Sequence, residues 1–302
     1  MEVNRRKGYL FAIMSTLAMS NVYIFSKAAL KEVNLAQFGF YWFGIALILL
    51  FLAIFVRGNQ KELKALQKSD FKVLATIGLL EIFSTSFFFM AINTIENPAI
   101  VSFLGNLKPL FVILLGFIVL NERFKGIEIF GLFITLIGAV ILGYKPNLTF
   151  KMLYDGGIFY ILTSIFFGAI SMTYIRKNQL KIPSIIYATS RSFFLFVASI
   201  IFLIYTDSSL AVSQNALVNL SFGATLGPFL AVLASYVAIK NMEVSRVSLV
   251  GTSKGVFVLL GSYLVFGSLP DTYQIIGGLI TIAGVITITL GKKLKRKAVK
   301  ID

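Results

Sequence analysis

Apolar residues fill most of this chain in long runs that short polar segments separate. Each run is close to the roughly 20 residues that a helix needs to cross a bilayer. Runs of this length favour helices over barrel strands, which are shorter and alternate apolar with polar positions. The pattern therefore predicts an all-α integral membrane protein with ten transmembrane helices. The predicted spans are residues 8–30, 35–56, 71–93, 98–120, 124–144, 155–176, 183–205, 215–239, 245–267 and 271–291.

One sequence motif occurs twice, once in each half of the chain. SFLGNLKPLFV begins at Ser102 and SLVGTSKGVFV begins at Ser248, so both read S-x-x-G-x-x-K-x-x-F-V at an offset of 146 residues. Each half holds five predicted spans. Because five is odd, the second half enters the membrane from the opposite side, which makes an inverted-topology repeat. We predict two five-helix repeats, residues 1–147 and residues 148–302, the second ending in a basic tail.

The distribution of Lys and Arg predicts how the spans are oriented. With the N-terminus in the cytoplasm, 21 of the 28 Lys and Arg residues fall on the cytoplasmic side, 3 fall outside and 4 lie within spans. This bias follows the positive-inside rule and places both termini in the cytoplasm. It also explains the net charge of +15 without nucleic acid as a partner. We expect a multi-pass protein of the cytoplasmic membrane, surrounded by the lipid bilayer.

Composition agrees with a membrane protein and removes several kinds of chemistry. Hydrophobic residues make up 57% of the chain, and charged residues 14%, against about 25% in soluble domains. The chain has no Cys and no His, which excludes disulfides, the usual zinc and haem sites and a His-based catalyst. We expect no metal, no cofactor and no enzymatic activity.

The repeated motif places a lysine deep in two predicted spans. Lys108 lies about ten residues, or about 15 Å, into the fourth span, and Lys254 is its counterpart in the ninth. Lysines near helix ends can snorkel to the interface, but this depth is too great for that. A charge at the centre of a span costs at least about 2.5–3.5 kcal/mol on insertion scales. The pair is therefore expected either to line a cavity or to form structural ion pairs.

Glycines and helix-weakening residues surround both lysines. Gly105 and Gly251 lie three residues before them, on the same helix face, and would let a ligand or a neighbouring helix approach closely. Pro109 and Gly255 follow the lysines. Such residues interrupt helices beside the binding sites of transporters, although ordinary packing and a kink would also explain them.

Glu81 is the one carboxylate deep in a predicted span, and Ser84 and Thr85 extend it into a polar stripe on one helix face. Glu81 is expected to neutralise one lysine, to carry a proton, or to form a static salt bridge. An offset of 147 residues pairs it with Pro228, so the predicted site is not symmetric in charge.

Three further residues lie within the predicted spans, and each has a structural interpretation. Asn21, near the middle of the first span, is a candidate site residue, although interhelical hydrogen bonding is its simpler role. Arg191 is either a gate or an anchor, since it lies about 12 Å deep by helical rise and can partly snorkel. Trp42, the only tryptophan, is expected to face lipid near the interface.

These features together resemble the EamA-like transporters of the drug/metabolite transporter superfamily. The similarity rests on ten spans in two inverted halves, the Lys108–Pro109 pair, the Asn121–Arg123 turn, and Gly131 and Gly138 in the fifth span. It implies a basket-like bundle in which the first four spans of each half surround a central cavity, with the fifth and tenth peripheral. It also implies transport of small metabolites by alternating access.

The chain departs from that family pattern in two places, which weakens any transfer of substrate. An arginine often found in the second span is absent where Trp42 lies, although Arg191 fits the seventh span, and Glu122 has no acidic equivalent at residues 267–268. The glycines at residues 131, 138, 277, 284 and 291 are expected to pack helices closely rather than to carry chemistry.

The favoured function is a secondary active transporter for a small metabolite, either an amino acid or an organic anion, that is a monomer or a homodimer. The lysines would supply positive potential, and Glu81 would balance charge or couple transport to protons. An exporter of neutral or cationic drug-like compounds and a non-transporting membrane subunit or scaffold are the alternatives. The candidate substrate-binding residues are Lys108, Lys254, Glu81, Asn21, Ser84, Thr85, Gly105, Gly251 and Arg191.

Overall fold

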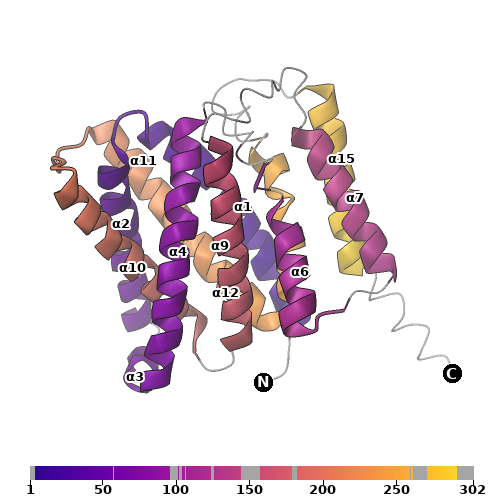
Figure 1. Ribbon diagram of the computed structural model, residues 1–302, viewed down its shortest axis with the longest axis horizontal. Coiled ribbons are helices and arrows are strands. Elements are labelled where there is room, and N and C mark those ends of the chain that lie inside the picture. Colours follow the sequence, from indigo (N-terminus) through magenta and orange to yellow (C-terminus); the bar gives the residue numbers. More distant parts are fainter. Residues whose placement is uncertain are drawn as a thin grey trace.

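The described part of the chain is an all-helical bundle whose long helices run side by side (Figure 1). The computed structural model describes residues 4–56, 58–95, 101, 104–105, 107–123, 126–143, 157–178, 182–258, 260 and 271–290. The elements of the first half are α1 (Arg5–Ala29), α2 (Leu35–Val56), α3 (Gln60–Lys64), α4 (Lys68–Thr94), α6 (Lys108–Leu120) and α7 (Gly126–Gly143). Those of the second half are α9 (Gly157–Asn178), α10 (Ser184–Tyr205), α11 (Gln214–Ala224), the π-helix η1 (Thr225–Ala231), α12 (Val232–Asn241), α13 (Val244–Gly251) and α15 (Thr272–Leu290).

Many of these helices are long and apolar enough to cross a membrane. Among the described residues, six helices meet that standard: α1, α2, α4, α9, α10 and the continuous helix of α11, η1 and α12. Shorter apolar helices cover Lys108–Leu120, Gly126–Gly138 and Ile275–Thr287. The protein is therefore a multi-pass membrane protein. The count of ten spans stays a prediction, because parts of the fourth, fifth, sixth, ninth and tenth spans lie outside the described residues.

The outer surface of the bundle suits a lipid environment. Phe55, Phe117 and Ile201 are each more than 60% exposed, and many other large apolar side chains are exposed as well. In water such a surface would be an extensive apolar patch. Because lipid tails are themselves apolar, this surface is stable in a bilayer without a protein partner.

Helix packing follows the inverted repeat. The first helix of each half packs against the third helix of the other half. Thus α1 contacts the continuous helix of α11 and α12, and α9 contacts α4 in the same way. The first helix also contacts the fourth of the other half, as the α1–α13 contact shows. The second and fifth helices pair with their own equivalents, α2 with α10 and α7 with α15. These reciprocal contacts are what a pseudo-two-fold axis produces.

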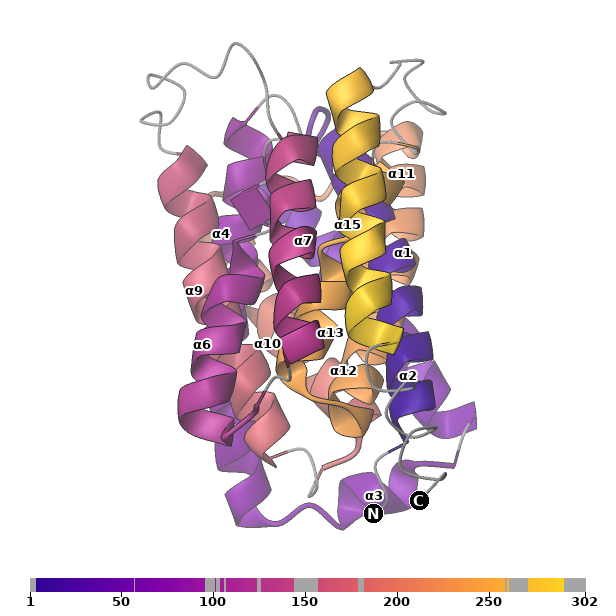
Figure 2. The same cartoon turned by 90° about the vertical axis from the view of Figure 1, so that its right-hand side faces the viewer.

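Glycines allow α7 and α15 to pack closely, as predicted. A Cβ atom added at Gly138 would lie 2.8 Å from the carbonyl oxygen of Gly277. One added at Gly284 would lie 2.8 Å from that of Gly131. Neither position has room for a larger side chain, so the two backbones touch. Figures 1 and 2 show the pair side by side at one edge of the bundle, where the family resemblance placed the fifth and tenth spans.

Both lysine motifs interrupt their helices. The span predicted at residues 98–120 has a turn at Leu107, where the Leu107 N–H donates to the Leu104 carbonyl, and α6 begins at Lys108. In the second half, Thr252 and Ser253 form a turn after α13, and the helix resumes at Lys254. Each lysine therefore lies at the first residue of a helical segment rather than within an unbroken helix.

Candidate functional site

A cavity of about 240 Å³ lies at the centre of the bundle. Its described lining comes from α1, α2, α4, α6, α9, α10, η1, α12 and α13, and also includes Gly105, Thr252 and Lys254. No described residue of α7 or α15 takes part. This arrangement agrees with the resemblance, which implied a cavity surrounded by the first four spans of each half.

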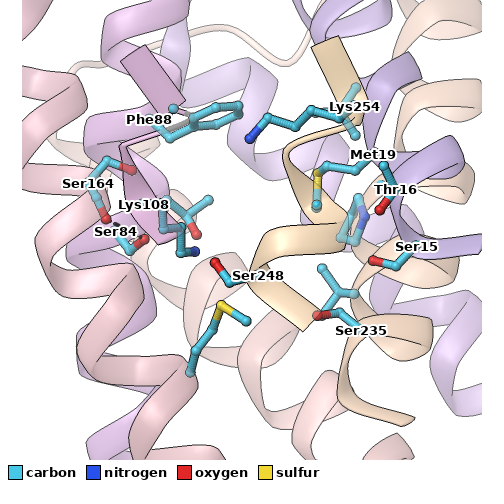
Figure 3. Close-up of a pocket in the computed structure, with 18 of the residues that line it drawn as sticks. Ser15, Thr16, Met19, Ser84, Phe88, Lys108, Ser164, Ser235, Ser248 and Lys254 are labelled. Atoms are coloured by element: carbon cyan, nitrogen blue, oxygen red, sulfur yellow. Dashed lines mark hydrogen bonds between the residues drawn. The ribbon is translucent and has the colours of Figure 1, made fainter. Parts of the chain in front are cut away.

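Lys108 and Lys254 enter the cavity from opposite sides (Figure 3). Lys108 lies against α9, since a Cβ atom at Gly168 would be 2.8 Å from its Nζ and 2.7 Å from Ser84 Oγ. Lys254 extends across the cavity, with its Nζ 5.9 Å from the centre of the Tyr23 ring. No carboxylate of the described residues lies within ion-pair distance of either ammonium group.

Glu81 pairs with Arg191 rather than directly with a lysine. Arg191 Nε donates to a Glu81 oxygen at 2.5 Å, and Ser171 Oγ donates to the other oxygen at 2.6 Å. Arg191 Nη2 donates to Thr85 Oγ1 at 2.7 Å. Lys108 lies farther off, beyond ion-pair distance of Glu81 and beside Ser84, which is three residues farther along α4. Among the sequence-based alternatives, the structure therefore shows a salt bridge for Glu81 and makes Arg191 its partner.

The two predicted glycines both line the cavity but have different surroundings. A Cβ atom at Gly105 would lie 3.4 Å from Lys254 Nζ and 3.5 Å from the Tyr23 hydroxyl oxygen. A Cβ atom at Gly251 would have no neighbour within 4 Å among the described residues. Gly105 thus gives room for the ammonium of the opposite repeat, whereas Gly251 faces open space in the cavity.

Two positions differ from the sequence-based interpretation. Asn21 does not line the cavity, and its amide donates to the Leu17 carbonyl of its own helix at 3.0 Å, so it makes no described bond between helices. Trp42 does not face lipid: it is 1% exposed, stacks on Phe38, and reaches the cavity beside Gly223. The expectation rested on the usual position of aromatic side chains near the membrane interface, whereas here Gly223 leaves room for the ring inside the bundle.

Pro228 also belongs to the site. It lies in η1, which lines the cavity on the side of the second repeat. Proline has no N–H and cannot continue an α-helical ladder, and the chain accommodates it here with a π-helical segment. Ser15 Oγ on α1 donates to the Ala231 carbonyl at 2.8 Å, which satisfies one backbone group of this segment.

Sequence reasoning missed most of the hydroxyl groups of the cavity. Ser15, Thr16, Ser164, Ser235 and Ser248 line it in addition to the predicted Ser84 and Thr85 (Figure 3). Single serines and threonines are common in transmembrane helices, where they bond to their own backbone. The position of Ser248 in the repeated motif was the one usable indication.

A second buried charge cluster was also missed. Arg246 is buried and pairs with Glu128 at 2.8 Å and with Glu243, which also pairs with Arg5 at 2.7 Å. Glu122 accepts hydrogen bonds from the backbone N–H groups of Val244 and Ser245 and from the Ser245 hydroxyl. We call these five charged residues, Arg5, Glu122, Glu128, Glu243 and Arg246, the ion-pair cluster.

The ion-pair cluster joins the two repeats at the end of the bundle that carries α3 (Figure 2). Arg5, Glu122 and Glu128 belong to the first half, and Glu243 and Arg246 to the second. Burial alone would raise the pKa of the Glu243 carboxyl, but its hydrogen bond to Arg246 and the charges of Arg246 and Arg5 outweigh burial and lower that pKa. In the sequence Arg246 counts among the topology-determining charges, and nothing near it points to Glu128, 118 positions earlier.

Comparison with known proteins gives the same family as the sequence features. The EamA-like transporter family matches residues 6–144 and 155–290, so two copies cover the chain. An uncharacterized transporter of Archaeoglobus fulgidus is 25% identical over 295 residues, covering 94% of this chain and 97% of that protein. A protein of known crystal structure has a TM-score of 0.75 at 16% identity, covering 95% of this chain and 99% of that one. At that identity the structural match supports the fold alone.

Proposed function

We propose that this chain, which belongs to the EamA-like transporter family, is a secondary active transporter that moves a small organic anion or an amino acid across the cytoplasmic membrane. Membership of the family makes it a membrane transporter. The substrate, the alternating-access mechanism and the cytoplasmic membrane are our proposal. The positive-inside bias supports an orientation with both termini in the cytoplasm.

One observation supports the substrate class above the others. Lys108 and Lys254 face a shared cavity, and no described carboxylate pairs with either. A non-transporting scaffold would be expected to satisfy both ammonium groups with protein partners, because a charge inside a membrane-spanning bundle is costly without one. An exporter of neutral or cationic compounds would not benefit from two positive groups in its site. An anionic group on the substrate supplies what the cavity lacks.

Contacts between the repeats at both ends of the bundle support alternating access. The ion-pair cluster joins them at the α3 end. At the other end, Tyr41 donates to the Leu210 carbonyl at 2.6 Å, Gln37 donates to the Ser209 carbonyl at 2.8 Å, and Glu32 accepts from Ser213. We expect one set of contacts to open while the other stays closed, with the cavity between them.

Proton coupling would use the Glu81–Arg191 pair. In the structure Arg191 and the Ser171 hydroxyl hold the Glu81 carboxylate. We expect Glu81 to carry a proton in a conformation in which Arg191 releases it. Substrate binding at Lys108, which lies beside Ser84, a residue of the same helix as Glu81, offers a way to trigger that release. We expect the protein to work as a monomer or a homodimer in the bilayer, without nucleic acid.

A thermal-shift screen of the purified protein tests this proposal. Amino acids, organic acids, nucleotides, and neutral and cationic drugs are compared on the wild type and on Lys108→Gln/Lys254→Gln. A ligand at 100 times its Kd stabilises the fold by about 2.7 kcal/mol, which is readily measured. We expect an anion or a zwitterion to stabilise the wild type but not the double variant.

Transport itself is tested with the same ligands in proteoliposomes. Uptake or exchange of the stabilising ligand, abolished in the double variant, supports a transporter that uses both lysines. A shift by neutral or cationic compounds that is equal in both proteins would overturn the substrate class. Binding without movement in the liposomes would instead favour a non-transporting membrane subunit.

A further inference from the structure

The charged side chains of the cavity favour a narrower class of ligand than anions in general. Its described lining has three cationic side chains, Lys108, Arg191 and Lys254, and one carboxylate, Glu81. Arg191 and Ser171 already occupy both oxygens of that carboxylate. The described lining therefore offers two ammonium groups for anions and no carboxylate that remains open to a cation.

We propose that the substrate is a small dicarboxylate, with one carboxylate bound at Lys108 and the other at Lys254. This inference rests on the proposed transport function and narrows its substrate class from organic anions and amino acids to molecules with two separated negative groups. Figure 3 shows the two lysines reaching into one cavity from opposite sides, which suits two separate carboxylates better than one.

The Lys108 end offers its ammonium group as the donor for an anion. No described carboxylate pairs with Lys108. Its Nζ lies beside Ser84, since a Cβ atom added at Gly168 would be 2.8 Å from Lys108 Nζ and 2.7 Å from Ser84 Oγ. The Ser84 hydroxyl already donates to the Ser164 carbonyl at 3.0 Å, so the ammonium is the group at this end that remains to donate to a carboxylate.

The Lys254 end brings two donors together. The Tyr23 hydroxyl and Lys254 Nζ both lie close to Gly105, at 3.5 Å and 3.4 Å from the position of an added Cβ atom. The absence of a side chain at Gly105 leaves space where the two groups meet. A carboxylate can accept from an ammonium and from a phenolic hydroxyl at once, so this corner of the cavity suits one carboxylate.

The space between the two ends suits a short carbon chain. Phe88 and Met19 give the cavity apolar lining near Lys254, which extends toward Phe88 (Figure 3). A cavity of about 240 Å³ is smaller than the roughly 300–1,000 Å³ of sites for drug-sized ligands. An amino acid of similar length would place its ammonium group against a lysine, and the described lining has no open carboxylate to receive it.

Four matched probes test the proposal on the full-length protein in detergent. Succinate has two carboxylates, 4-aminobutyrate replaces one with an ammonium, butyrate replaces one with a methyl group, and methyl phosphate carries its negative charges on a single group. Calorimetric titration and thermal shifts give the Kd of each. We expect succinate to bind roughly tenfold or more tightly than the other three, the size of one charge-assisted hydrogen bond.

Single variants then assign each carboxylate to a lysine. In the wild type, the ratio of the butyrate Kd to the succinate Kd measures how much the second carboxylate of succinate contributes to binding. In Lys108→Gln and in Lys254→Gln we expect that ratio to fall to about one, because either variant leaves one ammonium for both ligands. Lys72→Gln, on an exposed lysine of α4, should leave the ratio unchanged. Melting curves without ligand establish that each variant is folded.

Several results would overturn the dicarboxylate proposal. These are binding of 4-aminobutyrate or methyl phosphate as tight as that of succinate, no binding of succinate, or a butyrate-to-succinate ratio that survives both single variants. Exchange measurements in proteoliposomes distinguish a failure of the dicarboxylate proposal from a failure of the proposed transport function. Transport of an amino acid or a neutral compound would refute the dicarboxylate and retain the transporter. Selective succinate binding without any exchange would retain the ligand and refute transport.

Discussion

Two buried charge clusters in this molecule differ in how the protein neutralises them. The ion-pair cluster at the α3 end gives its buried charges protein partners: Arg246 lies between Glu128 and Glu243, Arg5 adds to Glu243, and backbone N–H groups hold Glu122. The central cavity gives a protein partner to Glu81 but no described carboxylate partner to Lys108 or Lys254.

The difference separates structural charges from binding charges. A buried charge that the protein neutralises itself is already at low energy and loses stability when either partner is removed. A charge that lines the cavity without an ion-pair partner raises the energy of the empty protein, and a ligand of opposite charge recovers that energy on binding. The same substitution, charge to neutral, should therefore have opposite effects on stability in the two clusters.

The largest effect is expected for Arg246→Met. The substitution breaks the Arg246–Glu128 ion pair at a position where Glu128 is 1% exposed, and removing one partner of such a buried pair costs about 3–5 kcal/mol. Thermal unfolding in detergent, followed by circular dichroism, should show a large fall in Tm. Arg6→Met, at an exposed position on α1, is the matched control. A variant as stable as this control would mean that the ion-pair cluster does not hold the repeats together.

Removal of a cavity lysine should act in the other direction. Lys108→Met and Lys254→Met each remove a charge for which the described protein has no ion-pair partner, so we expect the free energy of unfolding to stay level or to rise. The upper limit is the cost of a buried lysine, about 2.5–3.5 kcal/mol on insertion scales. The same melting experiment measures it in the absence of ligand. A loss of stability comparable to that of Arg246→Met would show that both lysines are structural and would remove the contrast between the clusters.

The cavity lysines could be singled out from the sequence because a charge at that depth of a span has a high insertion free energy. The sequence could also predict the inverted repeat, since a constant offset of 146 residues linked two motifs. Glu81 was recognised for the same reason as the lysines. Its partner was not, because Arg191 lies 110 residues away and only the packing of α10 on α4 brings them together.

Residues near the ends of helices were harder to interpret from the sequence. Arg246 and Glu243 lie where basic residues also determine topology, so nothing local distinguished a buried pair from a solvated one. Trp42 was misplaced because an aromatic side chain near an interface usually faces lipid. Its actual surroundings depend on Gly223, a distant glycine that leaves room for the ring.

Glu122→Gln tests a smaller contribution to the ion-pair cluster. Glu122 accepts at 2.8 Å from the Val244 N–H and at 3.2 Å from the Ser245 N–H, in the first turn of α13. A glutamine keeps the size but directs an NH2 group at backbone donors and loses the attraction of a negative charge to the helix N-terminus. We expect a loss of roughly 0.5–2 kcal/mol, the usual value of a helix cap, in the same melting assay. Equal stability would show that α13 does not need this cap.

The smallest effect concerns pH and Glu243. Because its pKa is lower in the folded protein than in the unfolded chain, Glu243 contributes stability that is complete above its ordinary pKa and is lost as the pH falls through the lowered value. The Tm difference between wild type and Glu243→Gln should therefore be greatest near neutral pH and shrink in acid. Glu62→Gln removes an exposed carboxylate at the same end and corrects for the change in net charge.

A Tm difference that stays constant or grows as the pH falls would contradict this account of Glu243. It would mean that the carboxyl stabilises the fold through its shape or its neutral form rather than through the charges of Arg5 and Arg246. The contrast between the clusters would then rest on Arg246 and Glu128 alone. Arg5→Met separates the cases, because it weakens the pH dependence only if the charge on Glu243 is what its neighbours bind.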